Sequence, residues 1–278
     1  MPSNMRLRSI FLAPAVFVMI ALFVVPLLIT LAYSFLTRGP YGGVFTPWTF
    51  ENYQRALDPL YLVILWRSVW LAAVSTLFCL ILAFPVALYI ARAERNKALL
   101  LNLVMLPFWT SFLIRTYAWM FLLRDTGLVN VALEGLHVIH APIPLLFNDG
   151  AVVLGLVYGF LPFMVLPLYA TLEKLDPALL DAAFDLGATP WVALWRVIVP
   201  LSKPGIAAGC VLVFIPCLGA YLTPDLMGGG KTVMLGNLVQ SQFTTARDWP
   251  FGAAISLLLM LIVLVVARAL EKQSEKLL

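Results

Sequence analysis

The segment Asp181-Ala-Ala-Phe-Asp-Leu-Gly-Ala-Thr-Pro190 belongs to the longest charge-bearing interruption on one side of a very hydrophobic chain. Its residues predict a short helix, a break and a second amphipathic piece. Asp176 is a suitable N-cap, with Pro177 in the first turn, where a missing N–H has no consequence. Gly187 suits a left-handed residue that ends the helix, and Pro190 keeps the chain from running straight on. Periodicity alone fits an ordinary surface helix–turn–helix equally well.

The composition is that of a membrane protein. Hydrophobic residues make up 62% of the 278 residues and charged residues only 12%, whereas soluble domains average roughly half and a quarter. Cys79, Cys210 and Cys217 lie in apolar runs without metal-ligand spacing, so they are best explained as small core residues. His137 and His140 lack further ligands nearby, so no metal site is expected.

Six apolar runs are long enough to cross a bilayer, since about 20 helical residues span a hydrocarbon core about 30 Å thick. The chain is therefore expected to be one all-α transmembrane domain over residues 1–278. The first run is too long for a signal-peptide core and is expected to be retained, and residues 126–137 predict a short interfacial helix. The expected spans are residues 10–36, 68–91, 98–122, 150–172, 204–224 and 249–267.

The distribution of basic residues predicts the orientation. With six spans, both termini, the 92–97 turn and the 173–203 loop lie on one side, and they hold 11 of the 18 Lys and Arg residues. Acidic residues divide equally between the two sides. Because basic residues are retained in the cytoplasm, we expect both termini and the 173–203 loop to be cytoplasmic.

The 173–203 loop resembles the EAA loop of ABC-importer permeases, which reads Glu-Ala-Ala, three residues, Gly, nine residues, then Ile-x-Leu-Pro. Asp181-Ala-Ala stands first here, Gly187 follows at the same spacing, and Val197-Ile-Val-Pro200 completes the pattern. Asp181, Val197 and Val199 depart from it but preserve charge or shape. The resemblance implies a coupling helix that docks into a groove on an ATPase subunit. It implies that role for Asp181, Ala182, Ala183, Asp185, Leu186, Gly187, Ala188, Thr189 and Trp191.

Most of the chain from about residue 66 to 266 resembles spermidine/putrescine permeases of ABC importers. The matching stretches are 106–119, 159–169, 225–229 and 247–250. The resemblance implies a type I importer permease with the MetI-like fold. It also implies three kinds of partner: a second, homologous permease in a heterodimer, two ATPase subunits and a periplasmic substrate-binding protein.

Candidate residues for the translocation path are one charged residue in an expected span, several aromatic residues and acids at the external helix ends. Aromatic rings can line an amine path through cation–π contacts, although Trp and Tyr more often form interface belts. Arg115 can equally be explained by snorkelling at a helix end. Asp149 and Asp248 are expected at the external mouth, where they are either interfacial or receive a cation. The path candidates are Trp109, Arg115, Tyr117, Trp119, Tyr158, Phe160, Tyr221 and Asp225.

The leading hypothesis is therefore a non-enzymatic permease subunit that forms half of a polyamine path. No catalytic set stands out in the sequence. We expect no cofactor on this chain, with ATP–Mg bound by the partner ATPase subunits. The alternatives are an importer permease for another amine, an opine, ferric ion, thiamine, a phosphonate or another small solute. An ion-coupled secondary transporter fits less well, because that class carries carboxylates inside its spans.

Overall fold

The computed structural model describes residues 12–14 and 16–275, and they are predominantly helical. The expected first span at 10–36 therefore lies partly outside the described residues. The described residues fall into two compact units, one within 1–62 and 238–261 and the other within 63–237 and 262–278. Three helices include residues of both units: α4 (Pro59–Arg92), α14 (Leu235–Thr244) and α15 (Trp249–Glu275).

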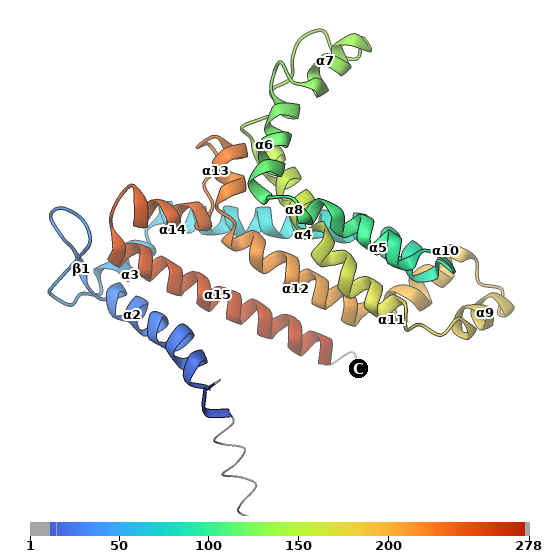
Figure 1. Ribbon diagram of the computed structural model, residues 1–278, viewed down its shortest axis with the longest axis horizontal. Helices are drawn as coiled ribbons and strands as arrows, with labels where there is room; N and C mark the ends of the chain where they lie inside the picture. Colours follow the sequence, from blue (N-terminus) through green and yellow to red (C-terminus); the bar gives the residue numbers. More distant parts are fainter. Residues whose placement is uncertain (1–11, 15, 276–278) are drawn as a thin grey trace, which may run out of the picture. The chain divides into compact units, whose positions relative to one another are not determined.

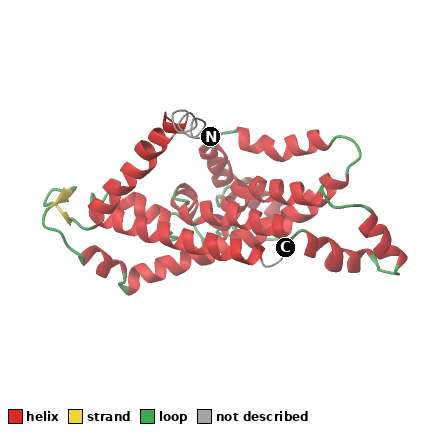
Figure 2. Ribbon diagram, turned by 90° about the horizontal axis from the view of Figure 1, so that it is seen from below, coloured by secondary structure: helices red, strands yellow, loops and turns green. Residues whose placement is uncertain are grey.

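The first unit begins with an apolar helix over Leu12–Ser34, long enough to cross a membrane. Among the described residues, the strands in Figure 2 form one hairpin, in which Thr37 pairs with Phe45 in antiparallel register. Beyond parts of α4, α14 and α15, the described elements of this unit are η1 (Ile20–Val24), α2 (Val25–Ser34), β1 (Thr37–Arg38), β2 (Val44–Phe45) and α3 (Glu51–Ala56).

Polar contacts fasten α3 to the end of α2. Asn52 is 8% exposed, and its Nδ2 donates to the carbonyls of Ser34 and Leu36 at 2.9 and 2.8 Å. The hydroxyls of Tyr53 and Ser34 lie 2.7 Å apart. Since a buried amide must find partners or lose stability, Asn52 fixes the direction in which the chain leaves the first span.

The second unit is built around α8 (Asp149–Leu172), which packs against α6, α12 and α13. Gly155 permits one close approach, because a Cβ there would lie 2.6 Å from the sulfur of Met227. The remaining elements wholly within this unit are α5 (Lys97–Met105), η2 (Leu106–Trp109), α6 (Phe112–Leu123), α7 (Leu128–Gly135), α9 (Ala178–Asp185), α10 (Pro190–Ala193), η3 (Leu194–Ile198), α11 (Val199–Leu201), α12 (Lys203–Gly219) and α13 (Leu222–Gly228).

Four helices are long and apolar enough to cross a membrane, and the number rises to six if each of two bent pairs is one span. The helix α4 starts at Pro59, so Arg67 is inside it and not in the expected connection. Residues 126–137 contain α7, as expected.

Two expected spans are broken. The axes of 97–109 and 112–135 differ by 84°, and α6 leaves α5 steeply in Figure 1. Pro107 lacks a helical N–H, and the extended backbone of Thr110 (ψ 153°) and Ser111 (ψ 133°) completes the break. The expected 204–224 run ends as α12 at Gly219, because Ala220 is extended with ψ 129°.

Candidate translocation path and coupling surface

The segment predicted to form the coupling helix is α9, and its start follows the expected capping chemistry. A carboxylate oxygen of Asp176 accepts a hydrogen bond from the Ala178 amide at 3.0 Å. After the break, Thr189 caps α10 by accepting from the Val192 amide at 3.4 Å, with Pro190 in the first turn. Both helices thus begin where the sequence provides an acceptor for otherwise unpaired N–H groups.

Gly187 ends α9 in the left-handed conformation, with φ +82°, which confirms the expectation for its backbone. The Gly187 amide donates to Phe184 at 2.9 Å, and the Ala188 amide donates to Ala183 at 3.0 Å. This pair of bonds is the Schellman motif, which closes a helix by using a residue with positive φ.

The α9–α10 segment exposes large apolar side chains. Leu186 is 89% exposed and Trp191 67% exposed. The rings of Trp191 and Trp195 lie 5.8 Å apart, while Ala193 and Ile198 are buried and anchor the segment. Ala183 and Ala188 are half-buried. The other coupling candidates are exposed: Asp181, Ala182, Asp185, Leu186, Gly187, Thr189 and Trp191.

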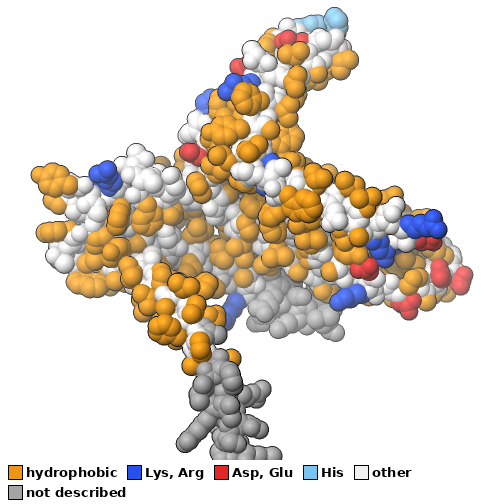
Figure 3. Space-filling model, in the orientation of Figure 1, with side chains coloured by type: hydrophobic (Ala, Val, Ile, Leu, Met, Phe, Trp, Pro, Cys, Tyr) orange, Lys and Arg blue, Asp and Glu red, His pale blue; other side chains and the backbone are white. Residues whose placement is uncertain are grey.

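A cavity of about 490 Å³ separates α9 from the α4–α5 turn. Leu180 and Phe184 line it from α9, and Arg92 lines it from the turn. Lys97 and Glu173 also line it, with Lys97 Nζ 3.2 Å from Glu173 Oε1, and charged side chains gather around this region in Figure 3. Hydrogen bonds from Tyr169 and Lys97 hold the pKa of Glu173 below its ordinary value. The cavity is thus bordered by α9 and by the adjoining ends of α4, α5 and α8.

Two of the three candidate acids already have arginine partners. Arg67 Nη2 lies 2.6 Å from Asp149, whose same oxygen accepts from the Thr232 hydroxyl at 2.6 Å. Arg67 also donates to the carbonyl of Lys231 at 2.9 Å. Asp149 thus fastens the loop after α13 to the start of α8. Arg67 was not among the candidates, and its position in an otherwise apolar helix was the available signal.

Asp248 is 2% exposed and forms an ion pair of 2.8 Å with Arg55. It also caps α15 by accepting from the Phe251 amide at 3.3 Å, and the Phe251 ring lies 4.0 Å from the Arg55 guanidinium. Burial lowers the pKa of Arg55, but hydrogen bonds to Asp248 and Tyr61 outweigh it and leave that pKa raised.

Asp225 differs from the other two acids. It lies on the first turn of α13 and is exposed. Among the described residues, no lysine or arginine forms an ion pair with it. Of the three acids, Asp225 therefore keeps its negative charge available to a cation.

Six aromatic residues form a seam between η2–α6 and α8. The ring centroids of Trp119 and Tyr158 lie 5.5 Å apart. The other two facing pairs are Phe112 with Phe160 at 6.4 Å and Phe108 with Phe163 at 5.3 Å. The structure thus brings together three of the predicted aromatic residues: Trp119, Tyr158 and Phe160.

The other predicted aromatic residues lie outside this seam. Trp109 is 73% exposed, and Tyr117 and Tyr221 are also exposed. Arg115 belongs with the seam, since it is 7% exposed and its guanidinium carbon lies 5.5 to 5.9 Å from the rings of Phe108, Phe112 and Tyr158. It does not snorkel to the surface of the chain.

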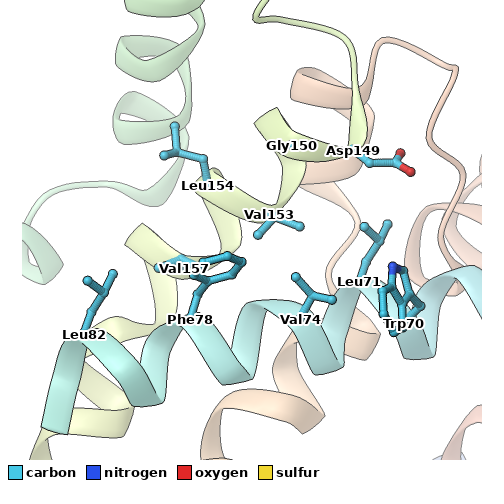
Figure 4. Close-up of a pocket in the computed structure, with 10 residues that line it drawn as sticks. All are labelled: Trp70, Leu71, Val74, Phe78, Leu82, Asp149, Gly150, Val153, Leu154 and Val157. Carbon is cyan, nitrogen blue, oxygen red and sulfur yellow. The ribbon is translucent and has the colours of Figure 1, made fainter.

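An apolar groove of about 520 Å³ lies between α4 and α8 (Figure 4). Trp70, Val74 and Phe78 face it from α4, and Val153 and Val157 face it from α8. Since its polar lining is confined to the Asp149 end, the groove offers little to hold a charged amine. Among the described residues, no cluster of three His, Cys, Asp or Glu side chains could hold a metal ion.

Comparison with known proteins agrees with this arrangement of helices. The family described as "Binding-protein-dependent transport system inner membrane component" matches residues 4–276. The chain belongs to this family. It is a multi-pass inner-membrane permease of the ABC-importer type, a transport subunit that is not itself catalytic.

Relatives from several bacteria carry the name "Spermidine/putrescine transport system permease protein PotB". The Escherichia coli protein is 45% identical over 258 residues, covering 90% of this chain and 94% of the relative. The Salmonella typhimurium protein is 46% identical over 239 residues, covering 86% and 83%. Among solved structures, a chain of a bacterial ABC transporter for alginate import superposes with a TM-score of 0.80 at 18% identity. That match covers 99% of this chain and 96% of the other. This last likeness confirms the fold.

Proposed function

We propose that this chain is the permease subunit of an ATP-driven importer and forms half of the translocation path for polyamines such as spermidine and putrescine. The observation that carries the substrate class is the 45% identity to PotB over most of both chains. The exposed Asp225 and the aromatic seam are consistent with a path for an organic cation.

The proposed transporter needs partners, because a permease subunit does not itself hydrolyse ATP. A second, homologous permease supplies the other half of the path in a heterodimer. Two ATPase subunits bind ATP–Mg, and a periplasmic binding protein delivers the amine. This chain binds no cofactor of its own in this proposal.

In the proposed mechanism, α9 receives force from the ATPase. Its exposed apolar side chains, Leu186 and Trp191 foremost, enter a groove on that subunit. The side of α9 that lines the cavity faces the α4–α5 turn, and the link between Lys97 and Glu173 joins the ends of α5 and α8. Movement of α9 is thereby passed to the helices that carry the seam.

The proposed orientation places both termini and the 173–203 loop in the cytoplasm. Asp149, Asp225 and Asp248 then lie at the external ends of their helices. The charge distribution of the sequence supports this orientation.

Reconstitution of the complete transporter in proteoliposomes tests the proposal. We expect uptake of radiolabelled spermidine when the liposomes enclose ATP and the binding protein is outside. We expect none with a non-hydrolysable analogue, and full activity in the presence of an ionophore. Uptake that follows an ion gradient without ATP would favour a secondary transporter. ATP-dependent uptake of a different solute, with which spermidine does not compete, would support the ABC-importer assignment and contradict the polyamine substrate.

A further inference from the structure

The buried guanidinium of Arg115 has no hydrogen-bond acceptor for two of its nitrogens. Its Nε and Nη1 are fully enclosed and have no hydrogen-bond acceptor among the described residues. A guanidinium cannot lose its proton at physiological pH, so burial does not remove the charge. Ionisable groups inside membrane segments are rarely left unpaired.

The surrounding rings compensate this charge only in part. Phe108, Phe112 and Tyr158 present π electrons at 5.5 to 5.9 Å from the guanidinium carbon, near the outer limit of cation–π attraction. Rings attract a cation but accept no conventional hydrogen bond from its N–H groups. An oxygen acceptor is therefore still missing.

Three acidic side chains of this chain are already engaged by basic partners. Asp149 is held by Arg67, Asp248 by Arg55 and Glu173 by Lys97. Asp225 is free of ion pairs and lies on α13, which contacts α6. It is nevertheless exposed, whereas Arg115 is buried, so the two are not paired in this structure.

A lipid phosphate is also a poor candidate. Arg115 lies eight residues before the end of α6 at Leu123, which is about 12 Å along a helix. Arg124 already occupies that end, 4.7 Å from the Phe121 ring, and would meet a headgroup first.

We propose that Arg115 is one half of an ion pair whose other half is a carboxylate of the second permease subunit. The inference rests on the heterodimer of the proposed function. Arg115 keeps 7% of its surface exposed, and its Nη2 is not among the enclosed nitrogens, so a carboxylate of the neighbouring subunit would meet the guanidinium on that side. The pair would then fix which permease binds this one and in which register.

Co-purification tests this pairing. Arg115→Gln should lower the amount of second permease recovered per molecule of tagged chain by at least about ten-fold. Without Arg115, the carboxylate of the second permease would be buried at the interface with no opposite charge. The ratio is normalised to this chain, so a lower expression level does not affect it. Arg124→Gln is the matched control and should leave recovery unchanged. Arg115→Lys keeps the charge and should give an intermediate value.

A second step identifies the carboxylate. Each intramembrane Asp or Glu of the second permease is changed to Asn or Gln in combination with Arg115→Gln. One such change should restore recovery to within about two-fold of the wild type, since loss of both partners costs far less than loss of one.

Three outcomes would overturn the pairing. The first is normal recovery with Arg115→Gln, and the second is a loss that no change in the second permease restores. The third is restoration by Asp225→Asn in this chain, which would assign the partner to α13. If the wild-type chain itself recovers no second permease, that result contradicts the heterodimer of the proposed function. A normal wild-type recovery combined with one of the three outcomes above contradicts only the Arg115 pairing.

Discussion

At the residue scale, pairing decides which acids can act on a substrate. Asp149 and Asp248 are held by Arg67 and Arg55, so their charge is already used in fastening segments of the fold. Asp225 is exposed and forms no ion pair with the described residues. An unpaired carboxylate attracts a polycation over a range that salt shortens.

Asp225→Asn should therefore raise the KM for spermidine uptake by about two- to five-fold at low ionic strength, and by less than about two-fold in 0.5 M salt. Asp125→Asn removes an equally exposed acid from the α6–α7 connection and serves as the control. Initial uptake rates over a range of spermidine concentrations measure the effect. An unchanged KM at both salt concentrations would show that Asp225 is an ordinary interfacial residue and does not attract the substrate.

At the scale of elements, the end of α9 depends on a single backbone conformation. Gly187 has φ +82°, and a Cβ built there would have no atom within 4 Å. A side chain at this position is thus penalised by the backbone and not by crowding. A β-branched residue suffers most from positive φ, whereas Asn tolerates it.

Gly187→Val should leave the amount of chain in the membrane near normal, because the apolar spans are unchanged. It should reduce ATPase co-purification, ATP-driven uptake, or both by about five-fold or more, as expected for a strain of 1–2 kcal/mol. Gly187→Asn is the matched control and should stay within about two-fold of the wild type. Equal behaviour of the two variants in both measurements would show that the turn does not set the position of α9.

At the scale of the whole molecule, composition and the length of the apolar runs were enough to predict an all-α membrane protein, and the positions of Gly and Pro were enough to predict the turn at Gly187. They did not predict the breaks at Thr110–Ser111 and Ala220, because an interrupted apolar run has the same composition as a continuous one. Arg67 and Arg55 were missed for a related reason. Their partners, Asp149 and Asp248, lie 82 and 193 residues away in the chain.

The aromatic candidates show the same limit. Residue type alone made Trp and Tyr residues candidates for the translocation path. The packing of the helices shows that Trp119 and Tyr158 lie in the seam, whereas Trp109 and Tyr221 are exposed. The missing acceptor of Arg115 is visible only when all neighbours are known.

In the proposed mechanism, force from ATP hydrolysis enters this chain at the 173–203 loop, which requires that loop to face the cytoplasm. Labelling of Asp185→Cys with a membrane-impermeant maleimide tests this directly, in a chain whose three native cysteines are replaced by alanine. We predict labelling in inside-out vesicles but not in right-side-out vesicles, with the opposite result for His140→Cys in the 124–149 connection. Labelling of Asp185→Cys in sealed right-side-out vesicles would contradict the claim.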